Sequence, residues 1–248
     1  MEFPSDLIET LRQAKKVAVL TGAGISAESG VPTFRDAQTG LWARFNPQEL
    51  ASEQAFRQNP ALVWEWYTWR REVIAKAKPN PGHQALVMLE ERIPHFTLIT
   101  QNVDGLHQRA GSGRRSPMIE LHGNIFRTKC FSENLPVEAW QETEEKPPRC
   151  PRCGGLLRPD VVWFGELPPT QAWSSAVSAA ITCDLFFTIG TSALVEPAAS
   201  LPFYAARAGV PVVEVNPNPT PFTPSAAFVI AGTAGQALPT LVRAVWGV

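Results

Sequence analysis

The chain contains 248 residues, with 22 basic and 23 acidic side chains that give a formal net charge of −1. This length suits one large domain, or one domain with a small insert, and allows a sizeable hydrophobic core. A nearly neutral chain lacks the clustered basic surface of general nucleic-acid binders, and no apolar run reaches the roughly 18 residues of a membrane helix. We therefore expect neither a nucleic-acid nor a membrane partner.

The predicted elements alternate between helices and buried strands along the chain. A helix is expected over residues 5–16, with a cap at Ser5 or Asp6. Short apolar runs then predict strands at 17–21, 96–100, 185–189 and 210–215, and helical patterns occupy 81–91 and 171–181. This alternation indicates a Rossmann-like α/β fold, a parallel sheet with helices on both faces. Ligands of such sheets bind at the carboxyl ends of the strands.

Two segments depart from this alternation and predict a small lobe. Residues 42–78 are helical in pattern and rich in aromatic side chains. Residues 124–160 hold three of the four cysteines together with several prolines, as in a zinc ribbon. We interpret both segments as inserts within one domain over residues 1–248. The cleft between this small lobe and the sheet is then the natural ligand site.

The first predicted strand leads into a glycine pattern that is typical of dinucleotide binding. Gly22, Ala23, Gly24 and Ile25 continue to Ala27, which matches G-x-G-x-x-G/A. Glycines in this pattern let the backbone turn tightly and approach a pyrophosphate. An ordinary strand-to-helix turn explains the same glycines, and the acidic residue expected about 20 positions later is not evident. The pattern alone leaves both interpretations open.

Further motifs follow in a fixed order along nearly the whole chain. They are GAGISAESGVPTFR at 22–35, QNVD at 101–104, LHG at 121–123, VVWFGE at 161–166 and GTS at 190–192. Together they resemble the sirtuin family, the NAD-dependent protein deacylases. The resemblance implies NAD as co-substrate and acylated-lysine proteins or peptides as partners. The implied products are nicotinamide, O-acyl-ADP-ribose and free lysine.

The same resemblance assigns residues to the NAD site. Phe34 and Arg35 belong to a cofactor loop in the family, where Phe34 covers the anomeric carbon and excludes water. The other implied NAD-binding positions are Gly22, Ala23, Gly24, Ile25, Gln101, Asn102, Val103, Asp104, Gly190, Thr191, Ser192, Asn216 and Ala234. From spacing alone, Asn102 and Asp104 are more often explained by a helix cap or a turn than by a role in chemistry. As chemical groups they can orient ribose hydroxyls and a carboxamide.

His122 is expected to act as the general base. A lone histidine is more often structural, so this assignment depends on the LHG motif. The unperturbed pKa of histidine, about 6.5, permits proton transfer near neutrality. In the implied reaction the acyl oxygen attacks the anomeric carbon of NAD, nicotinamide leaves, and His122 deprotonates a ribose hydroxyl. Asn102 and Asp104 complete the predicted catalytic group, and the remaining histidines are interpreted as structural: His83, His95 and His107.

Three cysteines predict a structural zinc site. Cys150 and Cys153 have the CxxC spacing of a zinc knuckle, and Cys130 lies upstream. The upstream pair is broken, because Glu133 stands where the family has its second cysteine. An oxygen ligand from Glu133, a water in its place, and weak or absent zinc binding all remain open. The metal would be structural in each case, since these residues lie outside the predicted cleft.

The helical insert contains a pair that bears on the substrate. Tyr67 and Arg70 are three positions apart and share one helix face. Aromatic core packing with a solvated arginine explains the pair, but Tyr-x-x-Arg also resembles the class III branch of desuccinylases, demalonylases and deglutarylases. An arginine can hold a carboxylate with two hydrogen bonds, and a tyrosine hydroxyl adds a donor. Ala37 matches a small residue that widens the acyl pocket in that branch.

We therefore expect a deacylase that prefers succinyl, malonyl or glutaryl groups and retains some deacetylase activity. In the family, a segment matching Val162, Trp163 and Phe164 pairs with the substrate backbone as an added strand. The alternatives are a plain deacetylase, an ADP-ribosyltransferase or NAD hydrolase, and a binding module with decayed catalysis. His122 and the Tyr67/Arg70 pair favour deacylation. We also expect a cytoplasmic monomer.

Overall fold

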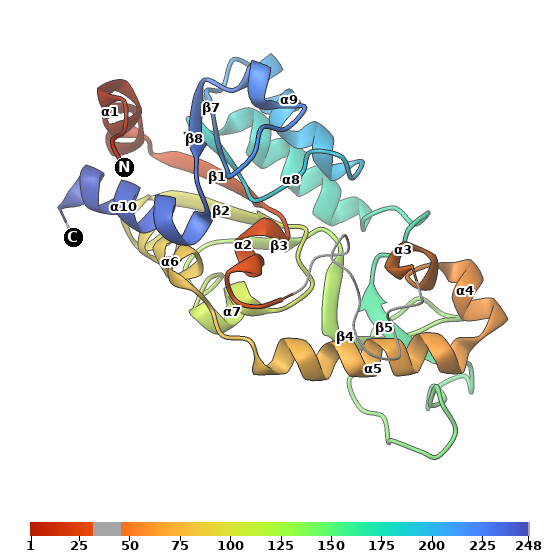
Figure 1. Ribbon diagram of the computed structural model, residues 1–248. Coiled ribbons are helices and arrows are strands. Elements are labelled where there is room, and N and C mark those ends of the chain that lie inside the picture. The colour runs from red at the N-terminus through yellow and green to blue at the C-terminus, as the bar shows by residue number, and fades with distance from the viewer. Residues whose placement is uncertain (32–45, 248) are drawn as a thin grey trace.

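The computed structural model describes residues 1–31 and 46–247. A six-stranded sheet forms its main body (Figure 1). The strands are β1 (Lys16–Thr21), β2 (His95–Thr100), β3 (Met118–Glu120), β6 (Leu185–Ile189), β7 (Val212–Asn216) and β8 (Phe228–Ala231). They are parallel in the order β3-β2-β1-β6-β7-β8. The order reverses between β1 and β6, the switch point at which doubly wound sheets bind ligands. The predicted Rossmann-like fold is confirmed.

Apolar residues on both faces of the strands place the sheet between two helical layers. Val17 and Val19 of β1 pack into one core cluster, whereas Ala18 and Leu20 pack into the other. The first cluster is covered by α1 (Ser5–Gln13), α6 (Pro81–Arg92) and α10 (Ala234–Trp246). The second is covered by α8 (Thr170–Thr182) and α9 (Leu201–Arg207), on the opposite side of the sheet (Figure 1). Strands buried on both faces read as continuous apolar runs, which is why the sequence predicts them.

The structure differs from the sequence prediction at the edge strands of the sheet and at the start of the first helix. The edge strands β3 and β8 have only 3 and 4 residues and are partly exposed, so they carry no long apolar run. The predicted cap of the first helix is wrong. α1 begins at Ser5 directly after Pro4 without a side-chain cap, and the Asp6 carboxylate instead accepts from the N–H of Leu7.

The two inserts fold together into a small lobe beside the sheet (Figure 1). The first supplies α3 (Pro47–Leu50), α4 (Glu53–Gln58) and α5 (Pro60–Lys76), and the second supplies the antiparallel strands β4 (Gly123–Cys130) and β5 (Leu157–Val161). Phe56 and Trp66 from the helices share an apolar cluster with Ile125 and Trp163. The small lobe therefore has a core of its own.

Short elements complete the fold at the carboxyl ends of the strands. They are α2 (Gly24–Ala27), α7 (Leu106–Ala110), η2 (Ala198–Ser200) and η3 (Thr223–Ser225). Within the described residues, no helix has both the length and the apolar character that crossing a membrane requires.

Candidate active site

A cavity of about 640 Å³ lies between the small lobe and the carboxyl ends of the sheet strands. It brings together predicted residues from distant parts of the chain: Gly22, Ala23, Gly24, Tyr67, Arg70, Gln101, Asn102, Val103, Asp104, His122, Val162, Trp163, Phe164, Gly190, Thr191, Ser192 and Asn216. Most of the predicted catalytic, NAD-binding and substrate-binding residues thus line one cavity.

Some predicted residues lie elsewhere. Ile25 is fully buried, and both it and Ala234 belong to the core cluster under α6 and α10 rather than to the described cavity wall. Their apolar side chains pack α2 and the start of α10 onto the sheet, so a role for them in NAD binding stays a prediction. Phe34, Arg35 and Ala37 lie outside the described residues.

The floor of the cavity is a backbone contact between the loops after β1 and β6. The Gly24 N–H donates to the Gly190 carbonyl oxygen at 2.7 Å. A Cβ atom on Gly22 would lie 2.8 Å from that oxygen, and one on Gly24 would lie 2.7 Å from Gly190 Cα. Only glycine permits so close an approach. This bare backbone at the switch point suits the pyrophosphate of a dinucleotide such as NAD.

A buried polar network lies beside this floor. Asn102 Nδ2 donates to the Gly22 carbonyl oxygen at 3.0 Å and to Ser26 Oγ at 3.2 Å. Ser26 Oγ in turn donates to Asp104 Oδ2 at 2.7 Å, and Asp104 Oδ1 accepts from Leu106 N at 2.8 Å. Burial raises the pKa of Asp104, while these hydrogen bonds oppose the rise. Asp104 therefore shapes the turn before α7 and also lines the cavity.

His122 is held in the orientation that a base requires. Its Nδ1 lies 3.1 Å from the carbonyl oxygen of Gln101. A carbonyl only accepts, so Nδ1 carries the proton and Nε2 keeps its lone pair. Burial lowers the pKa of His122, partly offset by this hydrogen bond, so the ring is neutral at pH 7.

Two other histidines make structural contacts. His83 Nδ1 accepts from the Asn80 N–H at 3.3 Å and completes the capping box at the start of α6. His107 Nε2, on α7, lies 2.9 Å from Thr21 Oγ1 at the carboxyl end of β1. Burial lowers the pKa of both rings, that of His83 to about 4, so both are neutral. His95, at the start of β2, is exposed.

Tyr67 and Arg70 reach the cavity wall from α5. Arg70 is only 4% exposed, which excludes the solvated arginine that the sequence left open. Its guanidinium lies 5.1 Å from the ring centre of Trp66. Burial lowers the pKa of Arg70 and raises that of Tyr67, so the tyrosine keeps its proton at neutral pH. A positive group and a phenolic donor thus lie three residues apart at one wall.

The segment predicted to pair with substrate is already paired within the chain. The backbone N–H groups of Val162, Trp163 and Phe164 donate, respectively, to the His122 carbonyl, to Glu166 Oε2 and to the Ala51 carbonyl. The Trp163 carbonyl also accepts from the Glu166 N–H at 2.9 Å. Pairing of a substrate strand with this segment therefore stays a prediction.

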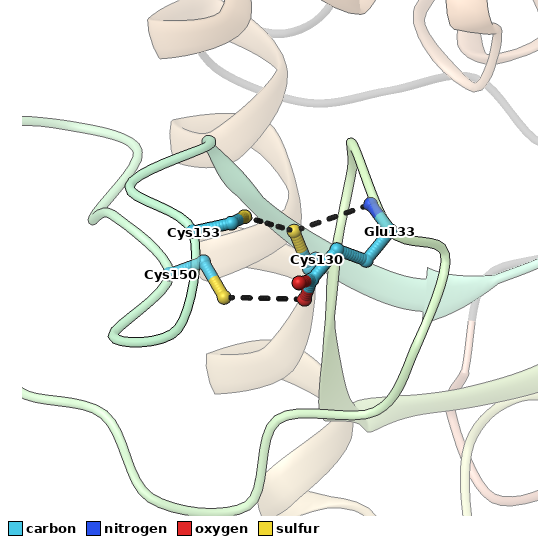
Figure 2. Close-up of side chains that lie close together, drawn as sticks. All are labelled: Cys130, Glu133, Cys150 and Cys153. Carbon is cyan, nitrogen blue, oxygen red and sulfur yellow. Dashed lines mark hydrogen bonds between the residues drawn. The ribbon is translucent and has the colours of Figure 1, made fainter.

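The cysteine insert brings four potential metal ligands together (Figure 2). The ligand atoms of Cys130, Glu133, Cys150 and Cys153 all lie within 4.8 Å of one another. Cys130 Sγ is 3.4 Å from Cys153 Sγ, and Cys150 Sγ is 3.8 Å from Glu133 Oε2. Three sulfur ligands and a carboxylate are compatible with a structural zinc ion. These residues do not line the cavity, so such an ion would hold the lobe rather than take part in chemistry.

The structure also adds residues that sequence reasoning missed. Ser26 links Asn102 to Asp104, and only its place inside the glycine motif hinted at this role. Glu166 lines the cavity and pairs with the buried Arg158. Thr220 belongs to a further stretch of the wall, over residues 218–221.

Comparisons with known proteins agree with this geometry. The model of the Sir2 family matches residues 22–197. The chain is 48% identical over 252 residues to an NAD-dependent protein deacylase of Methylococcus capsulatus, covering 98% of each chain. A solved Sir2 homolog–NAD complex has a TM-score of 0.88 and 43% identity, covering 98% of this chain and 94% of that one. A solved Sir2 complex with a p53 peptide and NAD+ has a TM-score of 0.83 and 31% identity, covering 98% of both chains. The chain therefore belongs to the Sir2 family, as the order of its motifs indicated.

Proposed function

We propose that this Sir2-family enzyme, an NAD-dependent protein deacylase, prefers lysine acyl groups that end in a carboxylate, such as succinyl, malonyl and glutaryl groups. The observation that carries this proposal is the placement of Arg70 and Tyr67 on the wall of the cavity that also contains His122. The solved complex of a Sir2 protein with a peptide and NAD+ supports peptides as the acyl carriers.

Each group of cavity residues has a separate role in the proposed reaction. NAD, when bound, would supply an anomeric carbon that becomes electrophilic as nicotinamide leaves. The network of Asn102 and Asp104 would orient the ribose and the carboxamide beside the glycine floor. His122 offers its Nε2 lone pair to a ribose hydroxyl, because Nδ1 is engaged with Gln101. The proton of that hydroxyl would move to His122 Nε2.

Electrostatics favour an anionic acyl end. A guanidinium that is 4% exposed has lost most of its hydration, and burial accordingly lowers the pKa of Arg70. A carboxylate beside it can accept charge-assisted hydrogen bonds from the guanidinium, whereas the methyl end of an acetyl group cannot. The tyrosine hydroxyl can donate to the same carboxylate. Removing a charge-assisted hydrogen bond costs about 1.5–3 kcal/mol, or roughly 10- to 150-fold in efficiency.

The test compares one peptide carrying either a succinyl or an acetyl group on the same lysine. Nicotinamide release is measured with NAD, for the wild type and for Arg70→Met. We expect the variant to lose at least about tenfold in desuccinylation efficiency, with a much smaller loss in deacetylation. Arg71→Met is the matched control, because Arg71 lies on the same helix but donates to the carbonyl of Ile125 and does not line the cavity.

Three results would contradict this proposal. Equal loss of both activities in Arg70→Met would remove the carboxylate-binding role. Acetyl turnover equal to or better than succinyl turnover in the wild type would make the protein a plain deacetylase. Nicotinamide release without any acyl peptide would favour an ADP-ribosyltransferase or an NAD hydrolase.

A further inference from the structure

A single hydrogen bond fixes the direction in which Tyr67 can donate. The indole Nε1 of Trp163 donates to the Tyr67 hydroxyl oxygen at 3.0 Å. Both side chains are at least 98% buried, at 1% and 2% exposure, and both line the cavity. An indole nitrogen can only donate, so in this contact the Tyr67 oxygen is the acceptor.

This contact has a consequence for the hydroxyl proton. A phenolic O–H prefers to lie in the plane of its ring, on one side of the oxygen or the other. The side that faces Trp163 receives the indole N–H, so the proton of Tyr67 occupies the opposite side. Tyr67 therefore presents a donor, and not a lone pair, to the remaining space around its oxygen.

The indole is itself held in place. The guanidinium carbon of Arg158 lies 3.2 Å from the ring centre of Trp163, and the ring of Phe56 packs at 5.3 Å. Glu166 pairs with Arg158 through Oε2 at 3.0 Å and accepts the Trp163 backbone N–H through the same oxygen at 2.8 Å. The indole cannot turn away from Tyr67 without losing its contacts with Arg158 and Phe56.

We propose that Trp163 is a specificity-determining positioning residue that makes Tyr67 a hydrogen-bond donor toward the acyl end. Arg70 also only donates, so a carboxylate, which only accepts, is favoured over a neutral amide of the same size, whose NH₂ group would meet no acceptor on either side chain. The inference rests on the proposed function and deepens it. The indole nitrogen touches Tyr67, and its effect on the acyl group passes through that tyrosine.

The experiment removes the indole N–H and follows a ratio of efficiencies. Trp163→Phe keeps an aromatic ring under Arg158, and replacement of Trp163 by benzothienylalanine keeps the full bicyclic shape with sulfur in place of N–H. Because Trp163 also borders the cavity, the readout is the succinyl-to-acetyl ratio of kcat/KM on one peptide. We expect this ratio to fall about three- to tenfold in both variants, mainly through the KM of the succinyl peptide.

Two further measurements separate this role from simple packing. In a Tyr67→Phe background, removing the indole N–H should leave the ratio unchanged, because no hydroxyl remains to orient. A peptide whose succinyl carboxylate is replaced by a terminal amide should be discriminated against by the wild type and less so by the Trp163 variants. Trp64→Phe is the matched control, since Trp64 is buried on α5 against Trp140 and does not line the cavity.

The outcomes are decisive in each direction. An equal fall of both activities in the benzothienylalanine protein, or the same fall of the ratio in the Tyr67→Phe background, would overturn the role of Trp163. If Arg70→Met collapses the ratio while the Trp163 variants do not change it, only this inference fails. If Arg70→Met leaves the ratio unchanged, the proposed function fails and this inference fails with it.

Discussion

Glu214→Gln is expected to weaken NAD binding more than it weakens the fold. Glu214 lies in β7 and is only 3% exposed. Its carboxylate accepts hydrogen bonds from the hydroxyls of Thr220 and Thr223. Thr220 lines the cavity, and Thr223 follows the cavity-lining stretch. Thr220 Oγ1 also accepts from Phe222 N at 3.1 Å, and Thr223 Oγ1 accepts from Thr220 N at 2.7 Å. Each hydroxyl thus gives its proton to the carboxylate and a lone pair to the backbone.

The magnitude follows from this arrangement. A glutamine offers one carbonyl oxygen and one NH₂ group, so one of the two hydroxyls loses its acceptor and meets a donor instead. A buried donor left without an acceptor costs about 1–3 kcal/mol. If the variant relieves this cost by opening the loop locally, and the open loop does not bind NAD, the KM for NAD rises by at most about fivefold to 150-fold. The free energy of unfolding falls by less than the full cost.

The assay measures the KM for NAD at saturating acyl peptide, together with the thermal unfolding midpoint. Glu90→Gln is the matched control, because the buried Glu90 accepts backbone N–H bonds from Gly113, Arg115 and Ser116 away from the cavity. It should lower the midpoint and leave the KM for NAD unchanged. A Glu214→Gln protein with an unchanged KM for NAD and a lowered midpoint would refute the reasoning, since the network would then serve only the fold.

The remaining predictions concern the base, the metal site and the cavity floor. His122→Ala should abolish deacylation. Because burial lowers the pKa of His122, wild-type kcat/KM should fall only as the pH drops below about 6.5, where the ring gains its proton. A fall that begins well above that pH would contradict the assignment of His122 as the base. Glu133→Cys should tighten zinc binding and Glu133→Ala should loosen it, as measured by chelator competition and metal content; identical metal retention in both would exclude Glu133 as a ligand. Gly24→Ala should destabilise the protein by about 1–3 kcal/mol, because its Cβ would lie 2.7 Å from Gly190 Cα; an unchanged unfolding midpoint would show that the floor can relax.

The sequence predicts those elements that depend on neighbouring residues or on a regular pattern along the chain. The strands from β1 to β7 that are buried on both faces appear as continuous apolar runs, and the glycine motif appears because its backbone geometry tolerates few other residues. The Tyr67/Arg70 pair is visible because residues three apart share a helix face. The short edge strands escape prediction, since neighbouring strands supply their hydrogen bonds and they need no apolar run of their own.

By itself, the sequence determines the fold class, the family motifs and the residue types available for chemistry, because each follows from spacing along the chain. Only the tertiary structure decides which of these residues meet. It places Arg70 out of solvent, brings Glu133 to the three cysteines, and engages the backbone N–H groups of the predicted substrate strand. It also pairs Trp163 with Tyr67, which lie 96 positions apart. Burial and hydrogen-bond direction depend on contacts between segments that are distant in sequence, and such contacts exist only after the chain has folded.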